Sequence, residues 1–301
     1  MMPYCQLKTC SISYQLFGTK NTTIVIEAGL DTCKAEWLHI AETLSKDYQV
    51  LIYDRPGYGK SSSSMIKRSP ENIASELHGL ITKLKINNSL ILLGHAVGGL
   101  YLQQYARMYP EQIKGLILLD PVTGFEHRFK EELSKPMYQG SGIDKTKRLK
   151  YGYYLTKIKL GFLLKSSLKK LPPFCYYDNF TNVTKKDLIR NLTRNTPYKT
   201  ALEENRVSHD KRYIKHLTSI DQFPDIPLVV IYHTPSYMVD EIISYGKLNQ
   251  EEAQKVEHLW EEITRSYLTY SSKSSWLQAN NSGHYLHLTE FNLILEALNK
   301  I

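Results

Sequence analysis

Residues 89–121 read SLILLGHAVGGLYLQQYARMYPEQIKGLILLDP, and this stretch decides the fold. The apolar run at 90–93 is typical of a short strand buried on both faces of a parallel sheet. A turn over 94–98 follows, with glycine at each end, and apolar residues then recur at helical spacing over 100–108. We therefore expect a strand, a tight turn and a helix in direct succession.

The middle residue of that turn is Ala96. A nucleophile elbow has the same strand–turn–helix context, with a serine held in a strained backbone at this position. Gly94 and Gly98 stand two residues away on either side, where a side chain would collide with the strand or the helix. A methyl group cannot attack a carbonyl, so Ala96 supplies no nucleophile. Two explanations stay open: an engineered replacement of serine, or a natural relative that lacks the catalytic group.

Length and composition indicate a globular protein. The 301 residues suffice for one large α/β domain with an insertion or for two smaller domains, and 42% of them are hydrophobic. The four cysteines, at positions 5, 10, 33 and 175, form no CxxC pair, which favours reduced thiols and a cytoplasmic location. The first ten residues contain no apolar segment, so we expect neither a signal peptide nor a membrane span.

The positive charge is concentrated in one segment. The chain carries a net charge of +8, and residues 121–221 alone contain 21 Lys and Arg against 10 Asp and Glu. Such a segment could attract anionic ligands or acidic lipid, or could simply keep a mobile region solvated. No nucleic-acid-binding motif accompanies the charge, so a nucleic-acid partner is not expected.

Strand and helix patterns alternate along most of the chain, which indicates a parallel sheet built from right-handed crossovers. Strands are expected at 11–17, 22–26, 50–53, 90–93, 115–119, 227–232 and 275–279. The alternation stops over 121–221, which has the pattern of helices and loops. We therefore predict a doubly wound, mostly parallel α/β sheet, with a core of residues 1–120 and 222–301 and an inserted helical cap of residues 121–221.

One leucine-rich stretch of the insertion is predicted to be a single amphipathic helix that ends at Pro172-Pro173. Its apolar face could pack on the sheet domain or line a substrate pocket. The leucines that share this face are Leu160, Leu163, Leu164, Leu168 and Leu171.

Five motifs resemble those of the α/β-hydrolase superfamily, in its capped esterase-like and proline-iminopeptidase-like branch. They are specific for the fold and less so for the substrate. The matching pieces are the elbow, Glu27-Ala28-Gly29-Leu30, Tyr53-Asp54-Arg55-Pro56-Gly57-Tyr58-Gly59-Lys60-Ser61, Leu119-Asp120-Pro121, and Ser282-Gly283-His284-Tyr285-Leu286-His287.

The resemblance implies a catalytic triad in which His284, in a glycine-containing loop after the last strand, is the base. His287 is the fallback, and His95 inside the elbow is expected to be a packing residue. The acid that orients the base follows either the strand after the elbow helix, which gives Asp120, or the next strand, which gives Asp240. Both acids remain candidates at this point.

An oxyanion hole needs two backbone N–H donors. The residue after the nucleophile provides one, here Val97, and the resemblance assigns the other to Leu30. The family often has His-Gly where this chain has Ala28-Gly29, but a backbone donor tolerates that difference.

With serine at position 96, the resemblance implies a hydrolase that cleaves an ester, lactone or related acyl bond of a small, fairly apolar molecule. The alternatives are a peptidase or amidase of the same fold, and a non-catalytic binding protein or receptor that keeps the pocket. No cofactor is expected, because Gly57-Tyr58-Gly59 lacks the third glycine of a dinucleotide loop. No metal is expected either, since no His/Cys cluster has metal-ligand spacing.

Overall fold

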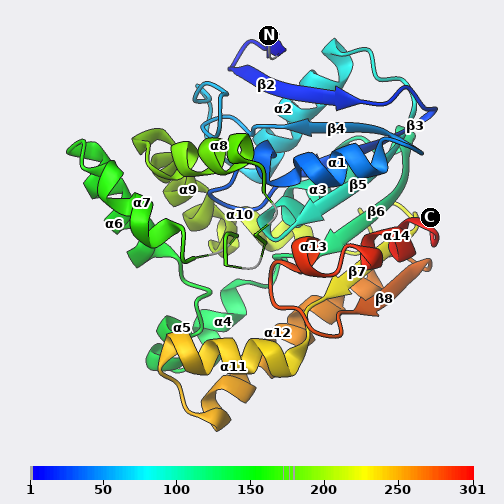
Figure 1. Cartoon of the computed structure of the whole chain (residues 1–301). Helices are drawn as coiled ribbons and strands as arrows, with labels where there is room; N and C mark the ends of the chain where they lie inside the picture. The colour runs from blue at the N-terminus through cyan, green and yellow to red at the C-terminus, as the bar shows by residue number, and fades with distance from the viewer. Residues whose placement is uncertain (1–2, 172, 176, 179) are drawn as a thin grey trace.

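The computed structural model describes residues 3–171, 173–175, 177–178 and 180–301. Eight strands form one sheet in the order β1-β2-β4-β3-β5-β6-β7-β8, with helices on both of its faces (Figure 1). The strands are β1 (Tyr4–Gln6), β2 (Ser11–Phe17), β3 (Thr22–Glu27), β4 (Gln49–Tyr53), β5 (Ser89–His95), β6 (Ile113–Leu119), β7 (Leu228–Tyr232) and β8 (Ser274–Gln278).

The strand directions confirm the predicted fold class. From β4 through β3, β5, β6 and β7 to β8, every neighbouring pair is parallel, whereas β1–β2 and β2–β4 are antiparallel. All seven predicted strands are present, with ends displaced by at most two residues. Strand β1 was not predicted, because three residues are too few for a period to be recognised.

Two apolar cores sandwich the sheet. Helices α2 (Pro70–Lys83) and α3 (Val97–Met108) cover one face, and α1 (Leu38–Leu44) and α14 (Asn292–Leu298) cover the other. The central strands β5 and β6 are therefore buried on both sides, which explains their continuous apolar runs. The Ser69 side chain accepts a hydrogen bond from the Asn72 amide and caps α2, with Pro70 in the first helical position.

The segment between β6 and β7 is helical, and its described residues contain no strand. Figure 1 shows these helices beside and below the ends of the strands. They are α4 (His127–Glu132), α5 (Lys135–Gly140), α6 (Thr146–Lys157), α7 (Leu164–Leu168), α8 (Asn182–Leu192), α9 (Asn195–Ser208) and α10 (Lys211–Ile214).

The prediction of one leucine-faced helix over residues 160–171 is wrong. Helix α6 ends before this stretch, Lys159 has a left-handed backbone with φ of 64°, and α7 is only five residues long. The leucines are accordingly divided: Leu164 and Leu168 are buried, whereas Leu160, Leu163 and Leu171 are exposed. The predicted stop at Pro172 lies outside the described residues, and α7 ends before it.

Two further helices, α11 (Pro235–Gly246) and α12 (Gln250–Arg265), connect β7 to β8. They pack against α4 and α5 through one apolar cluster, so this helical layer contains segments from before and after β7 in the sequence. Its buried members are Phe129, Met137, Ile143, Met238, Val239, Ile242, Leu248, Ala253, Val256, Leu259 and Ile263. Within the described part of the chain, no helix has the length and apolar character needed to cross a bilayer.

Candidate active site

The connection from β5 to α3 is a strained turn centred on Ala96, whose backbone has φ 51° and ψ −122°. Its flanking glycines leave no room for a side chain. A Cβ on Gly98 would lie 2.3 Å from the Glu27 carbonyl oxygen, and one on Gly94 would lie 2.8 Å from the Gly99 Cα. This is the geometry in which an elbow presents a residue to the substrate cavity.

His284 and Asp120 meet beside this turn. Asp120 follows β6 with a positive φ of 42°, and His284 lies in the loop after β8. The His284 Nδ1 is 2.5 Å from the Asp120 Oδ2. An ionised carboxylate only accepts hydrogen bonds, so Nδ1 carries the proton and Nε2 is left for proton transfer. Both residues and Ala96 line one cavity.

The alternative acid lies elsewhere. Asp240 is exposed on α11, whereas the Asp120 carboxylate is completely buried against the His284 imidazole. The geometry therefore favours Asp120 as the partner of His284.

The two backbone donors assigned to the oxyanion hole also flank Ala96. Leu30 and Val97 both line the cavity, and in the described part of the structure neither amide N–H is hydrogen bonded. The turn that carries Leu30 lies against the elbow, because a Cβ added to Gly29 would be 3.7 Å from the Ala96 Cβ. The two amides are thus free to donate to a negative charge near Ala96.

Comparison with known proteins supports the fold described above. The model of the alpha/beta hydrolase fold family matches residues 22–163. The solved enol-lactonase from Burkholderia xenovorans LB400 superposes with a TM-score of 0.64 and 16% identity, covering 99% of this chain and 100% of that one. The chain has the α/β-hydrolase fold.

The matching sequence relatives cover a smaller share of this chain. The uncharacterized protein YqjL of Bacillus subtilis (strain 168) is 26% identical over 217 residues, which is 68% of this chain and 84% of YqjL. A protein provisionally named carbamate hydrolase RutD, from Pantoea ananatis, is 28% identical over 44% of this chain. That match spans half of RutD's own length.

A second histidine contacts the buried acid, and it was not among the predicted site residues. His233, directly after β7, is fully buried, with Nδ1 2.7 Å from the Asp120 Oδ1 and Nε2 3.0 Å from the Glu257 Oε2. Burial opposes its protonation, yet Asp120 and Glu257 raise the pKa of His233 to about 10. The position of His233 directly after a strand could have pointed to it, because β7 lies parallel beside β6 and both strands end at the same edge of the sheet.

The charge of His233 acts on Asp120 in turn. Burial by itself would raise the pKa of the Asp120 carboxyl, but the charge and hydrogen bond of His233, with those of His284, lower it well below its usual value. Asp120 is therefore held ionised at neutral pH and keeps its proton-accepting role toward the His284 Nδ1.

The two other histidines near the elbow are buried packing groups. The His95 Nε2 donates to the His284 carbonyl oxygen at 2.9 Å, and His287 stacks on Trp37 and bonds Glu36 at 3.0 Å. Burial lowers the pKa of both imidazoles. Glu36, His95 and His287 are the group of described residues whose ligand atoms come close enough to hold a metal ion, within 4.8 Å of one another.

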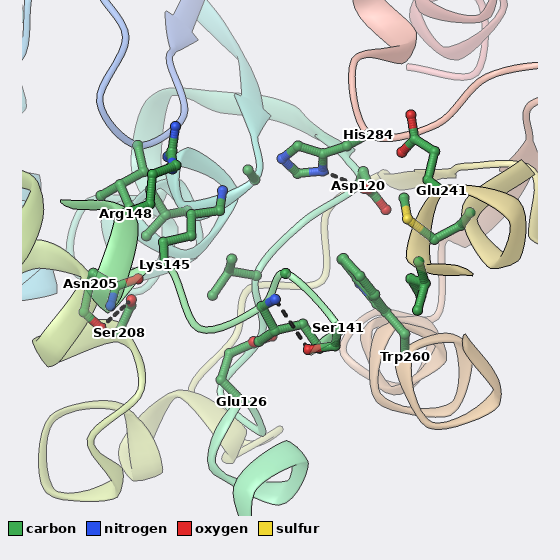
Figure 2. Close-up of a pocket in the computed structure, with 18 of the residues that line it drawn as sticks. Asp120, Glu126, Ser141, Lys145, Arg148, Asn205, Ser208, Glu241, Trp260 and His284 are labelled. Carbon is green, nitrogen blue, oxygen red and sulfur yellow. Dashed lines mark hydrogen bonds and ion pairs between the residues drawn. The ribbon is translucent and has the colours of Figure 1, made fainter. Parts of the chain in front are cut away.

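The cavity beside Ala96 has a volume of about 300 Å³ and is mostly apolar. The walls come from both helical regions, including Ile143 from the segment after β6 and Met238 and Trp260 from α11 and α12. Figure 2 shows Lys145 and Arg148 on one side of the pocket and His284, Glu241 and Trp260 on the other.

The charges in the cavity are unevenly compensated. The Arg148 Nη2 lies 2.7 Å from Asp31, whereas the Lys145 ammonium has no ion pair with a described residue. Burial raises the pKa of Glu126 to about 8, and burial followed by the charge of Asp120 raises that of Glu241 to about 7. Both carboxyls are thus partly or mostly protonated near neutral pH.

Proposed function

We propose that this protein is built for acyl transfer from an ester, lactone or related bond of a small, fairly apolar molecule, and that the reaction needs serine at position 96. The observation that carries the proposal is the contact between His284 and Asp120 beside the elbow, at a mostly apolar cavity. Names of similar proteins, such as enol-lactonase, point the same way.

In the proposed reaction, the hydroxyl of a serine at position 96 attacks the scissile carbonyl while the His284 Nε2 removes its proton. Asp120 keeps the imidazole in the required tautomer and stabilises the imidazolium. The oxyanion of the tetrahedral intermediate accepts hydrogen bonds from the amides of Leu30 and Val97. His284 then returns the proton to the leaving alcohol, and an acyl-enzyme remains.

Water completes the cycle. His284 takes a proton from the attacking water, and the second tetrahedral intermediate uses the same two amides. As the intermediate collapses, His284 returns the proton to the departing serine oxygen, which releases the acid and restores the hydroxyl. A peptidase or amidase would follow the same steps with an amine as leaving group, and is the alternative within this chemistry.

Residues 121–221 are proposed to act as the cap that shapes the substrate cavity, together with α11 and α12. Side chains of both segments line the cavity beside Ala96. A cap of this kind holds an apolar substrate while the core supplies the chemistry.

A second function rests on Ala96 itself. Because the methyl group cannot react, the chain as it stands would bind a substrate without turnover, which is what a receptor or binding protein of this fold does. This function and an engineered substitution predict the same behaviour of the Ala96 chain, but they differ in what a serine would do.

The test is the Ala96→Ser variant, assayed with p-nitrophenyl acetate and butyrate and labelled with a fluorophosphonate. By analogy with the loss on deleting a serine nucleophile, kcat should rise by up to about 10⁶-fold over the Ala96 chain. Ala96→Ser/His284→Ala is the matched control and should remain unlabelled. A folded Ala96→Ser protein that is inert and unlabelled would contradict acyl transfer and leave the binding function.

A further inference from the structure

An unusually basic stretch borders the cavity. Residues 145–177 contain nine Lys and Arg and no Asp or Glu. They form α6, the turn Gly161–Leu163 and α7, which stand at one edge of the molecule in Figure 1. None of the seven lysines between positions 147 and 170 makes an ion pair with a described residue. All seven are exposed, so they can contact an anionic partner.

The same stretch exposes large apolar side chains. Of the 14 large hydrophobic residues that are exposed in the described structure, seven lie within residues 151–171. Such side chains normally occur singly on a surface, so a concentration of this kind indicates an interaction site. The seven are Tyr151, Tyr154, Ile158, Leu160, Phe162, Leu163 and Leu171.

On α6 these side chains share one face with basic residues. Tyr151, Tyr154 and Ile158 follow each other at spacings of three and four, which places them on one side of the helix. Lys147 lies four residues before Tyr151 and is on the same side. The opposite side, with Leu149, is buried in a cluster that includes Tyr58 of the core and Tyr198 of α9. The outward face of α6 is thus both apolar and cationic.

A basic groove adjoins this surface. It has a volume of about 760 Å³ and lies between α7 and α8. Among its described lining residues Asp178 is the only acidic one, whereas the cationic ones are Lys165, Lys169, Lys185, Lys186 and Arg190. A groove with five cations and one carboxylate suits a phosphate-bearing group.

We propose that residues 147–171 form a docking surface for a membrane that contains anionic phospholipids. The exposed aromatic and aliphatic side chains enter the interface, the lysines contact the headgroups, and the groove between α7 and α8 receives one of them. This combination of an apolar face with flanking lysines is what holds a protein in the plane of an anionic interface. An acidic soluble partner would account for the lysines but not for the seven exposed apolar groups.

The docking surface is continuous with the mouth of the cavity, because Arg148 and Leu171 also line the cavity. A docked molecule would therefore hold that mouth near the lipid. The proposal does not depend on position 96, and it can be tested on the chain as it stands.

The test is co-sedimentation of the full chain with vesicles of phosphatidylcholine alone and of phosphatidylcholine with about one third phosphatidylglycerol. Binding to the anionic vesicles should exceed binding to the neutral ones at least about tenfold, and should weaken as salt is raised. Phe162→Trp should show a blue-shifted emission with anionic vesicles, which reports insertion rather than surface attraction.

Two double variants separate the contributions. Phe162→Ser/Leu163→Ser should bind anionic vesicles at least about tenfold more weakly. Lys165→Gln/Lys169→Gln should also bind them about tenfold more weakly and should show a smaller salt dependence than the parent. The matched controls are Met65→Ser and Lys46→Gln/Lys83→Gln. Met65 is an exposed apolar residue outside the docking surface, and the two lysines are exposed and lie outside the cap. Both controls should bind like the parent, and thermal unfolding checks that every variant is folded.

Three results would overturn the proposal. The chain could fail to bind anionic vesicles at low salt, or the two cap variants could bind no more weakly than their controls. Binding to heparin or DNA without vesicle binding would instead identify the surface as a site for a soluble polyanion.

Discussion

Asp120 accepts hydrogen bonds from two imidazoles, one on each carboxylate oxygen. His233 is buried and itself held by Glu257, so its charge is a fixed part of the core rather than a group exposed to substrate. His284 is 20% exposed and can reach the cavity. The buried imidazole thus keeps Asp120 ionised, and the accessible one is free to carry protons.

The assignment of the acid is tested in the Ala96→Ser background. Asp120→Asn should reduce kcat on the order of 10⁴-fold, because an amide at this position favours the wrong tautomer of His284. Asp240→Asn, on the exposed face of α11, should change kcat by less than about twofold, since surface positions away from the site have small effects. Initial rates with p-nitrophenyl butyrate measure both.

Circular dichroism must show that Asp120→Asn is folded, because the change leaves His233 with one fewer negative partner. If Asp240→Asn caused the larger loss, the acid would be Asp240 and the contact between Asp120 and His284 would be structural.

At the scale of elements, the strand–turn–helix unit of β5 and α3 requires glycine at position 98. Gly98→Ala would bring a Cβ to 2.3 Å from the Glu27 carbonyl oxygen, which is backbone and cannot rotate away. We expect a loss of about 2 kcal/mol or more in the free energy of unfolding. The control is Gly79→Ala in α2, where a Cβ would meet Leu7 at an ordinary 3.5 Å.

Urea denaturation measures both variants. Gly79→Ala should stabilise the protein by about 0.5–1 kcal/mol, because alanine favours the helix interior. Equal stabilities of the two variants would mean that the elbow relaxes around the added methyl group, and its strain would then not be imposed by the Glu27 turn.

Local patterns were sufficient for the elements that build the sheet and the elbow. Apolar runs located the strands, and the glycines at 94 and 98 located the turn that carries Ala96. The same patterns failed where the chain depends on distant partners. The leucines of 160–171 have helical spacing, but Leu163 and Leu171 are exposed rather than packed against another part of the chain.

Contacts between side chains that are far apart in the sequence could not be predicted from local patterns. His233 reaches Asp120 because β6 and β7 are neighbours, and Trp260 reaches the cavity because α11 and α12 pack on α4 and α5. Neither contact has a signature in the residues that surround it.

At the scale of the whole molecule, a buried charge network joins the cap to the core. Glu204 on α9 accepts hydrogen bonds from Arg55 at 2.9 Å, Arg68 at 3.2 Å and Tyr58 at 2.9 Å. Arg55 also bonds Glu27 at the end of β3. The carboxylate of Glu204 is fully buried, so its charge depends on these protein donors rather than on solvent.

The last prediction concerns this seam. Glu204→Gln keeps the shape of the side chain but leaves two buried guanidinium groups with less negative charge, which should cost about 3 kcal/mol or more in the free energy of unfolding at pH 7. Asp187→Asn is the control, because its ion pair with Lys60 also joins cap and core, with side chains 21% and 25% exposed. That pair should be worth about 1 kcal/mol or less.

The pH dependence gives an independent check. Burial would raise the pKa of Glu204, but Arg55 and Arg68 lower it below its usual 4.5. The stabilisation is therefore complete above pH 4.5 and is lost as the pH falls through the folded-state pKa. The gap in stability between the parent and Glu204→Gln, measured by urea denaturation, should accordingly narrow in acid. If Glu204→Gln and Asp187→Asn lowered the free energy of unfolding equally at pH 7, the buried network would not be what fixes the cap. The apolar contacts beneath α6 and α9 would then have to hold the cap in place.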